Sequence, residues 1–154
     1  MFATPERTVK IPGPDHAITI TPNPLRVVVS VGGHVIASSR EALTLRESHF
    51  GTVHYLPRKD VRMSLLERTT HATYCPYKGE CAYYSIPAGG ERSVNAVWTY
   101  ESPYESVAPI KDYVAFYPDR VGTIEQSFAP RGTSWVRPDP WVAPYPTDWA
   151  TRYP

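Results

Sequence analysis

This chain of 154 residues has almost no excess of charge of either sign and no long apolar runs. Its 16 lysines and arginines are balanced by 15 aspartates and glutamates, and they form no basic stripe that could follow a phosphate backbone. No apolar run approaches the roughly 20 residues that cross a bilayer, and residues 1–16 lack the continuous apolar segment of a signal peptide. We therefore expect a cytoplasmic protein with no nucleic-acid or membrane partner.

Cysteine is scarce, because the chain has only Cys75 and Cys81. Two cysteines are too few for a disulfide scaffold, and in a reducing compartment both are expected as thiols. A structural zinc site typically uses two Cys-x-x-Cys turns, and the chain has neither. A makeshift site from these two cysteines, His71 and a distant histidine is the alternative. The sequence predicts no bound metal and no cofactor.

The motifs of several common enzyme classes are also missing. The sequence contains no glycine-rich phosphate loop, no Gly-x-Ser-x-Gly elbow and no His-Glu-x-x-His helix. It also lacks the Gly-Ser segment and paired aspartates of metal-dependent nucleotidyl transfer. Any chemistry must therefore come from a less familiar cluster of side chains.

What the chain does contain is a set of short segments with a period of two, which is typical of β-strands. Residues 25–39 predict a hairpin with its turn at Gly32-Gly33. Residues 81–103 and 111–126 predict two more such units, with turns at Gly89-Gly90 and Pro118-Asp119. In the last unit Val114 and Phe116 are expected on one face of the strand, and Tyr113, Ala115 and Tyr117 on the other.

Helical segments are expected to be short. The runs at 40–45 and 60–68 are too brief for long helices, although Asp60 could cap one or two turns that end near Glu67. A chain of this length is one domain with extensions. The sequence therefore predicts an all-β, mainly antiparallel fold with short helical turns.

Several runs of the sequence resemble a known family, and the most specific is Thr-x-Cys-Pro-Tyr-Lys-Gly at 73–79. The other matching runs are "PGPDHAITITPNPLRVVV", "GGHVIASSREALTLRE", "VHYLPRKDVRMSLLE" and "NAVWTYESPYESVAPIKDYVAFYPDRV". Together they resemble the DUF427 family of small bacterial and fungal domains. The resemblance implies a β-tent fold, two antiparallel sheets leaning together, as in methionine sulfoxide reductase B and the drug-binding domain of cereblon. It implies no known activity, and Cys81 departs from the family pattern.

The resemblance divides the chain into an N-terminal arm at 1–11, a DUF427-like β domain at 12–125 and a C-terminal extension at 126–154. The extension is rich in proline, and Trp135, Trp141 and Trp149 lie among the prolines. Proline favours an extended path, and three indoles are poorly placed in bare solvent. We expect this tail to wrap its own domain; contact with a ligand or with a second subunit in a homo-oligomer is the alternative.

The segment 70–84, "THATYCPYKGECAYY", holds the candidate catalytic residues. Cys75 is a candidate nucleophile if the charge of Lys78 or His71 favours its thiolate; otherwise it is a packing residue beside a fixed turn. Lys78 is a solvated loop charge or a contact for an anionic group of a ligand. His71 is an ordinary loop histidine or a base.

Aromatic side chains are the candidate ligand contacts. Tyrosine and tryptophan have polar tips that need partners when buried, so a cluster of them often lines a pocket. The residues predicted to bind a ligand are Lys78, Tyr77, Tyr84, Trp98, Tyr100 and Tyr117. An aromatic cage at Trp98 is an analogy with the fold of cereblon's domain.

Three functions follow from these residues. The first is binding of a small, possibly anionic metabolite in an aromatic-lined pocket that the loop 73–79 closes. The second is an enzyme that uses Cys75, or Lys78 with His71, on a small molecule. The third is an interaction module whose tail docks on another subunit.

Overall fold

The computed structural model describes residues 7–128, in which ten strands and five short 3₁₀ helices form the fold. The strands are β1 (Ile18–Pro22), β2 (Arg26–Val31), β3 (His34–Ser39), β4 (Leu43–Glu47), β5 (Thr52–Tyr55), β6 (Glu67–Cys75), β7 (Gly79–Ser85), β8 (Val97–Thr99), β9 (Val114–Phe116) and β10 (Thr123–Ser127). The helices are η1 (Arg58–Asp60), η2 (Met63–Leu65), η3 (Pro87–Ser93), η4 (Glu105–Ile110) and η5 (Pro118–Arg120).

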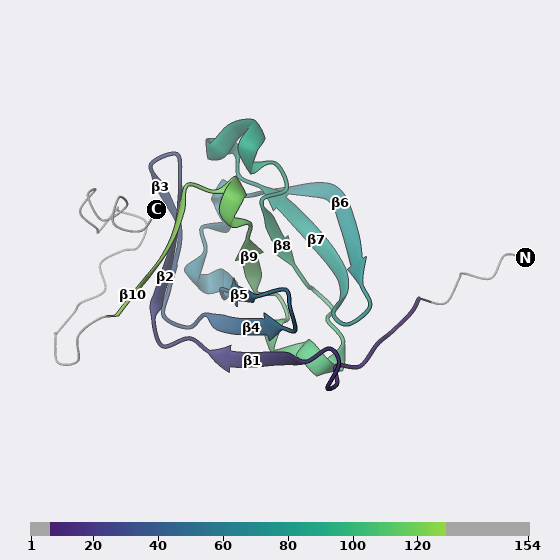
Figure 1. The fold of residues 1–154 in the computed structure, drawn as a ribbon. Coiled ribbons are helices and arrows are strands. Elements are labelled where there is room, and N and C mark those ends of the chain that lie inside the picture. The colour runs from purple at the N-terminus through teal and green to yellow at the C-terminus, as the bar shows by residue number, and fades with distance from the viewer. Residues whose placement is uncertain (1–6, 129–154) are drawn as a thin grey trace, which may run out of the picture.

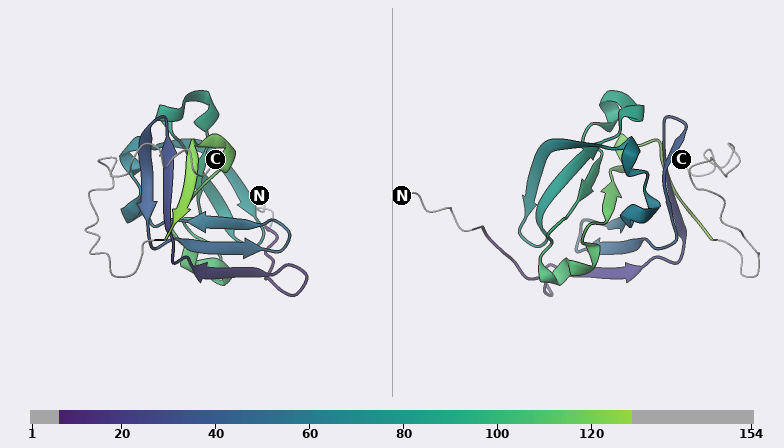
Figure 2. Two further views of the ribbon diagram at one scale, coloured as in Figure 1. Left: turned by 60° about the vertical axis from the view of Figure 1, so that its left-hand side comes forward. Right: turned by 180° about the vertical axis from the view of Figure 1, so that it is seen from behind.

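Within residues 7–128 the paired strands are all antiparallel, and they make three sheets in the orders β1-β4-β5, β10-β2-β3 and β6-β7-β8-β9. Figure 1 shows the β10-β2-β3 sheet and the β6-β9 sheet standing opposite each other, with the β1-β4-β5 sheet running across between them. The two further views in Figure 2 show the same arrangement. The predicted all-β, mainly antiparallel class is confirmed, and the β-tent subtype stays a prediction.

The first predicted hairpin is confirmed. Strands β2 and β3 pair around Gly32 and Gly33, whose φ angles are +57° and +79°. Positive φ at both positions of a two-residue turn is strained for side chains other than glycine. At Gly32 a Cβ atom would also lie 2.7 Å from the carbonyl oxygen of Ala88. This turn therefore requires glycine for its backbone angle and, at Gly32, also for space.

The second predicted hairpin is also present, because β7 and β8 pair, but Gly89 and Gly90 lie within η3 in a longer connection rather than in a tight turn. The third predicted hairpin is wrong. Pro118 and Asp119 lie in η5, but β9 and β10 on either side of it do not pair, since β9 adds to β8 and β10 adds to β2 in another sheet. Alternation identified these strands correctly, whereas pairing partners depend on contacts far apart in the sequence.

Two apolar clusters pack on opposite faces of the β6-β9 sheet. Val114 and Phe116 belong to the first cluster, together with valines of β2, whereas Ala115, Tyr113 and Tyr117 belong to the second. This confirms the alternation expected for β9. The second cluster packs against Leu45 and Tyr55 of the β1-β4-β5 sheet, and the candidate site lies on that side.

Asp60 does not cap a helix in the way predicted. It is the last residue of η1, it is buried, and its Oδ2 accepts a hydrogen bond of 2.6 Å from the hydroxyl of Ser39. The next helix, η2, begins after Arg62 and has no side-chain cap. Asp60 instead links η1 to β3, an interaction between positions 21 apart that propensity cannot reveal.

Within residues 7–128, no helix is both long and apolar enough to cross a membrane. The predicted wrapping or docking of the C-terminal tail concerns residues that lie almost entirely outside the described range.

Candidate functional site

A cavity of about 200 Å³ opens between the β1-β4-β5 sheet and the β6-β9 sheet. Its walls come from β4, the β4–β5 loop, β5, the β6–β7 turn, β7, β8 and the segments after β8 and β9. The lining residues are Leu45, Glu47, Phe50, Gly51, Val53, Tyr55, Lys78, Tyr83, Trp98, Tyr100 and Tyr117. Six of these eleven residues are aromatic and two are charged, so the cavity combines a ring-lined body with one polar end.

The aromatic wall follows from strand register. Tyr83 of β7 lies opposite Trp98 of β8, and Trp98 lies opposite Ala115 of β9, so these three residues form a row on one face of the sheet. The rings of Trp98 and Tyr117 lie with centroids 4.5 Å apart, and the indole Nε1 donates a hydrogen bond of 3.1 Å to the Tyr55 hydroxyl. The wall is thus fixed by both packing and hydrogen bonding.

The polar end of the cavity is a buried ion pair between Lys78 and Glu47. The Lys78 Nζ contacts Glu47 Oε1, and Glu47 Oε2 contacts the Nε2 of His16 at 2.7 Å. Burial alone raises the pKa of Glu47, but the hydrogen bonds from Lys78 and His16 and their charges outweigh it and hold that pKa below its usual value. Glu47 is therefore ionised at neutral pH, and its charge is balanced within the site.

A tight turn places Lys78 at the cavity. The amide of Lys78 donates to the carbonyl of Cys75 at 3.2 Å, which closes the β6–β7 connection, and Gly79 follows with φ of +109°. A Cβ atom at Gly79 would lie 3.3 Å from the carbonyl oxygen of Ser102. The Lys78 carbonyl in turn accepts from the amide of Tyr104 at 3.0 Å. Both the backbone angle and the close approach explain the glycine of the Cys-Pro-Tyr-Lys-Gly motif.

The tyrosine hydroxyls around the cavity stay protonated. Burial is the first cause that raises the pKa of Tyr55, Tyr83 and Tyr100 above the usual range. The Tyr83 hydroxyl also lies 2.9 Å from the Thr73 hydroxyl. The wall therefore offers neutral hydroxyls, which can donate or accept hydrogen bonds but add no charge.

Four of the predicted ligand contacts come together in this cavity: Lys78, Trp98, Tyr100 and Tyr117. Tyr77 lies next to it, where its ring stacks on His16 with centroids 3.9 Å apart and planes 4° apart. It supports the histidine that contacts Glu47. Their roles in binding stay predictions, but the structure does place these residues around one site.

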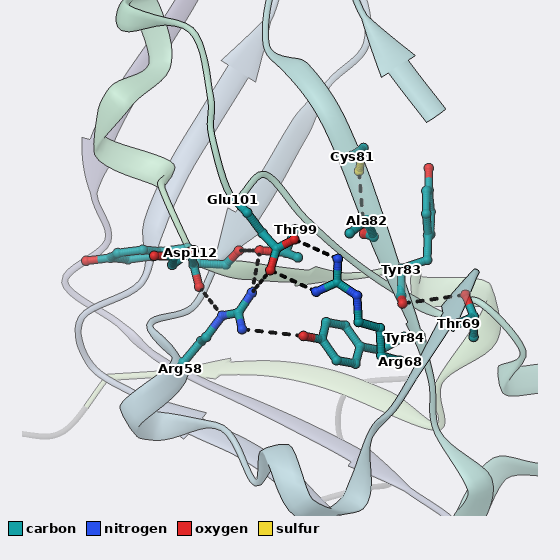
Figure 3. Close-up of polar contacts among 11 residues, drawn as sticks. Arg58, Arg68, Thr69, Cys81, Ala82, Tyr83, Tyr84, Thr99, Glu101 and Asp112 are labelled. Atoms are coloured by element: carbon teal, nitrogen blue, oxygen red, sulfur yellow. Dashed lines mark hydrogen bonds and ion pairs between the residues drawn. The ribbon is translucent and has the colours of Figure 1, made fainter. Parts of the chain in front are cut away.

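Tyr84, which is predicted to contact the ligand together with Trp98, lies on the other face of the sheet from Trp98. It lies opposite Val97 in the β7–β8 register, one residue out of phase with the row that contains Tyr83. In Figure 3 its hydroxyl is turned toward Arg58, whose Nη1 donates to it at 3.4 Å. The adjacent Tyr83 occupies the cavity wall instead.

Arg58 and Tyr84 belong to a second polar cluster (Figure 3), in which the side chains of Arg58, Arg68 and Glu101 are 30%, 52% and 38% exposed. Arg58 donates to the Asp112 carbonyl at 2.7 Å and to the Thr99 hydroxyl at 3.2 Å. Glu101 lies between Arg58 and Arg68 and accepts two hydrogen bonds from Arg68, at 2.9 and 2.8 Å. No lining residue of the cavity takes part in these ion pairs.

The candidate catalytic residues are not assembled into a reactive group by these contacts. Cys75 is partly buried and packs against the second apolar cluster, and His71 is exposed with its ring 4.5 Å from that of Tyr83. The ammonium of Lys78 contacts Glu47. Cys81 is buried, which raises the pKa of its thiol despite the nearby hydroxyls of Tyr83, Thr73 and Tyr100. Catalysis by Cys75, Lys78 or His71 stays a prediction.

Both cysteines are free thiols in the described structure. Across residues 7–128, no three His, Cys, Asp or Glu side chains gather in a group that could hold a metal ion. The makeshift set of Cys75, Cys81 and His71 is therefore not brought together with a further histidine in this range.

A wider groove of about 520 Å³ lies elsewhere, along β1, β4 and β5. Four of its polar side chains are bonded to one another: Thr44 Oγ1 lies 3.2 Å from His54 Nδ1, and Asn23 donates to Gln126 at 2.9 Å. Burial lowers the pKa of His54. This mutual pairing makes the groove a weaker candidate than the aromatic cavity.

Sequence reasoning missed Glu47, His16, Tyr55 and Tyr83 as members of the site. Glu47 could have been found from the sequence. Leu43, Leu45 and Glu47 share one face of a strand, and an acidic side chain is unusual on the face that carries the apolar residues. His16 follows a turn 31 residues before Glu47 and carries no comparable local pattern. Its place depends on the pairing of distant segments.

The fold and the site together define a small all-β domain with an aromatic-walled cavity and a buried lysine–glutamate pair. The chain belongs to the family described as a domain of unknown function, DUF427, whose family model matches residues 19–127. All eleven lining residues fall inside the matched range, whereas His16 falls outside it. A comparison with the curated proteins found no match.

Proposed function

We propose that this protein binds a small molecule in the cavity between the β1-β4-β5 and β6-β9 sheets. The observation that carries the proposal is the wall itself, six aromatic residues around about 200 Å³ with one buried ion pair at the edge. Binding sites are typically apolar hollows in which a few polar groups fix the orientation of the ligand.

The size of the cavity limits the ligand. Pockets for drug-sized molecules are roughly 300–1,000 Å³, whereas an apolar cavity of about 150 Å³ is enough to admit benzene. A volume of about 200 Å³ therefore fits a molecule with one ring and a short polar group. The rings of Trp98 and Tyr117 would pack on its body, and Lys78 and Glu47 would meet its polar end.

The test is a screen of single-ring fragments read by nuclear magnetic resonance. The indole N–H of Trp98 reports on the cavity, because it donates to Tyr55 inside the wall. A Trp98→Phe variant identifies this signal among those of the four tryptophans. We expect at least one class of fragment to shift it with a saturable concentration dependence.

A matched pair of variants separates binding in the cavity from binding elsewhere. Tyr117 and Tyr113 are both partly buried and both pack on the second apolar cluster, but only Tyr117 lines the cavity. Tyr117→Ala should weaken fragment binding at least tenfold, and Tyr113→Ala should leave it within about twofold. Equal losses in both variants, or no fragment that shifts the Trp98 signal, would count against the proposed function.

A further inference from the structure

The two charged residues that line the cavity cancel each other, and His16, which also contacts Glu47, lies outside the lining. Of the eleven lining residues only Glu47 and Lys78 carry charge, and they contact one another. The exposed fractions of their side chains are 12% and 10%, so both are largely removed from water. A ligand that brings a net charge into this space would add a charge that no lining residue balances, and removing that charge from water is unfavourable.

Both ions nevertheless have hydrogen-bonding capacity left. An ammonium has three donors and a carboxylate about four acceptor sites. The contact of Lys78 Nζ with Glu47 uses one donor, and the contacts of Glu47 use one site on each oxygen, toward Lys78 and His16. A group with one acceptor and one donor can therefore bind beside the pair without breaking it.

The remaining polar atoms of the wall are neutral. Tyr55, Tyr83 and Tyr100 line the cavity, and burial raises the pKa of the hydroxyl of each. They can complete the hydrogen bonds of an uncharged head group, but they cannot supply the charge that a carboxylate or an ammonium would require.

We infer that the ligand of this cavity is an uncharged single-ring molecule with a planar donor–acceptor group, of which a primary carboxamide is the simplest case. Its carbonyl oxygen accepts from Lys78, its amide N–H donates to Glu47, and its ring packs on Trp98 and Tyr117. This inference rests on the proposed function and replaces the anionic ligand expected from Lys78 alone.

Three isosteric probes test the charge of the ligand directly. Benzamide, benzoate and benzamidinium have nearly the same shape and carry no charge, a negative charge and a positive charge, respectively. Their dissociation constants are measured at pH 8 from the shift of the Trp98 indole signal. We expect benzamide to bind at least tenfold more tightly than either ion.

Charge variants of the pair give the matched controls. Glu47→Gln leaves Lys78 unbalanced and should move the preference toward benzoate, whereas Lys78→Met should move it toward benzamidinium. Lys78→Arg keeps the charge and should keep the preference for benzamide. If Lys78→Met fails to fold, the relative affinities of Lys78→Arg for the three probes still test the role of the charge at this position.

The outcomes separate this inference from the proposed function. Tighter binding of benzoate or benzamidinium to the unchanged protein would overturn the neutral ligand. The same holds if other fragments shift the Trp98 signal and benzamide does not, although the binding function would then stand. If no fragment of any kind shifts that signal, the proposed function itself fails.

Discussion

Two of the ion-pair clusters within residues 7–128 rank in opposite order by contact geometry and by burial. Arg68 and Glu101 form a two-pronged contact at 2.9 and 2.8 Å, which is the stronger geometry, yet their side chains are 52% and 38% exposed. Lys78 and Glu47 share a single contact, but their side chains are only 10% and 12% exposed. Exposure decides the energetic consequence, because water screens the first pair and is largely excluded from the second.

The two ion pairs also differ in how well a contribution to stability can explain their presence. An exposed pair contributes about 0–1 kcal/mol and its loss is easily tolerated. A buried pair is a weak source of net stability, because desolvation offsets most of the attraction, and an apolar pair of similar volume can replace it. A buried pair at the wall of a cavity is therefore better explained by what it contacts there than by the stability it supplies.

The largest expected effect is on the buried pair. Lys78→Met leaves the carboxylate of Glu47 without its ammonium and should lower the free energy of unfolding by about 3 kcal/mol, the low end for a broken buried pair because His16 still contacts Glu47. Chemical denaturation measures it. The double variant Lys78→Met, Glu47→Gln should recover more than half of the loss. Strictly additive losses would show that the two charges are not coupled.

A smaller effect should appear in acid. The pKa of Glu47 is lower in the folded chain than its usual value of 4.5, so its contribution to stability is complete above about pH 4.5 and is lost as the pH falls through the lowered pKa. Denaturation curves between pH 6 and 3 should therefore fall more steeply for the unchanged protein than for Glu47→Gln. The lowered pKa of Glu101, caused first by its hydrogen bond from Arg68, is common to both proteins and cancels. Parallel slopes would contradict the prediction.

Much of the fold could be predicted because it is local. The strand alternation of β9 and the glycine turn of β2–β3 follow from neighbouring residues, and both are present. The hairpin predicted around 118–119 was wrong because a turn pattern does not say which strands pair. Strand register also depends on contacts between distant segments. A shift of one position along β7 exchanges Tyr83 for Tyr84 at the cavity wall.

The site was predictable only in part for the same reason. Lys78, Trp98, Tyr100 and Tyr117 were identified from residue type and alternation, and the structure gathers them around one cavity. The partner of Lys78 is 31 residues away in the sequence and comes from a different sheet. A lysine alone predicts an anionic ligand, whereas a lysine already balanced by Glu47 does not.

The smallest expected effect is on the exposed cluster, and it completes the comparison. Arg68→Met removes both hydrogen bonds to Glu101, but water can solvate that carboxylate and Arg58 Nη2 lies 3.7 Å from it. The free energy of unfolding should fall by no more than about 1 kcal/mol, and 1 M salt should reduce the difference further by screening. The same denaturation measurement as for Lys78→Met gives the direct comparison. A loss of about 3 kcal/mol here would mean that contact geometry, rather than burial, decides the strength of ion pairs in this protein.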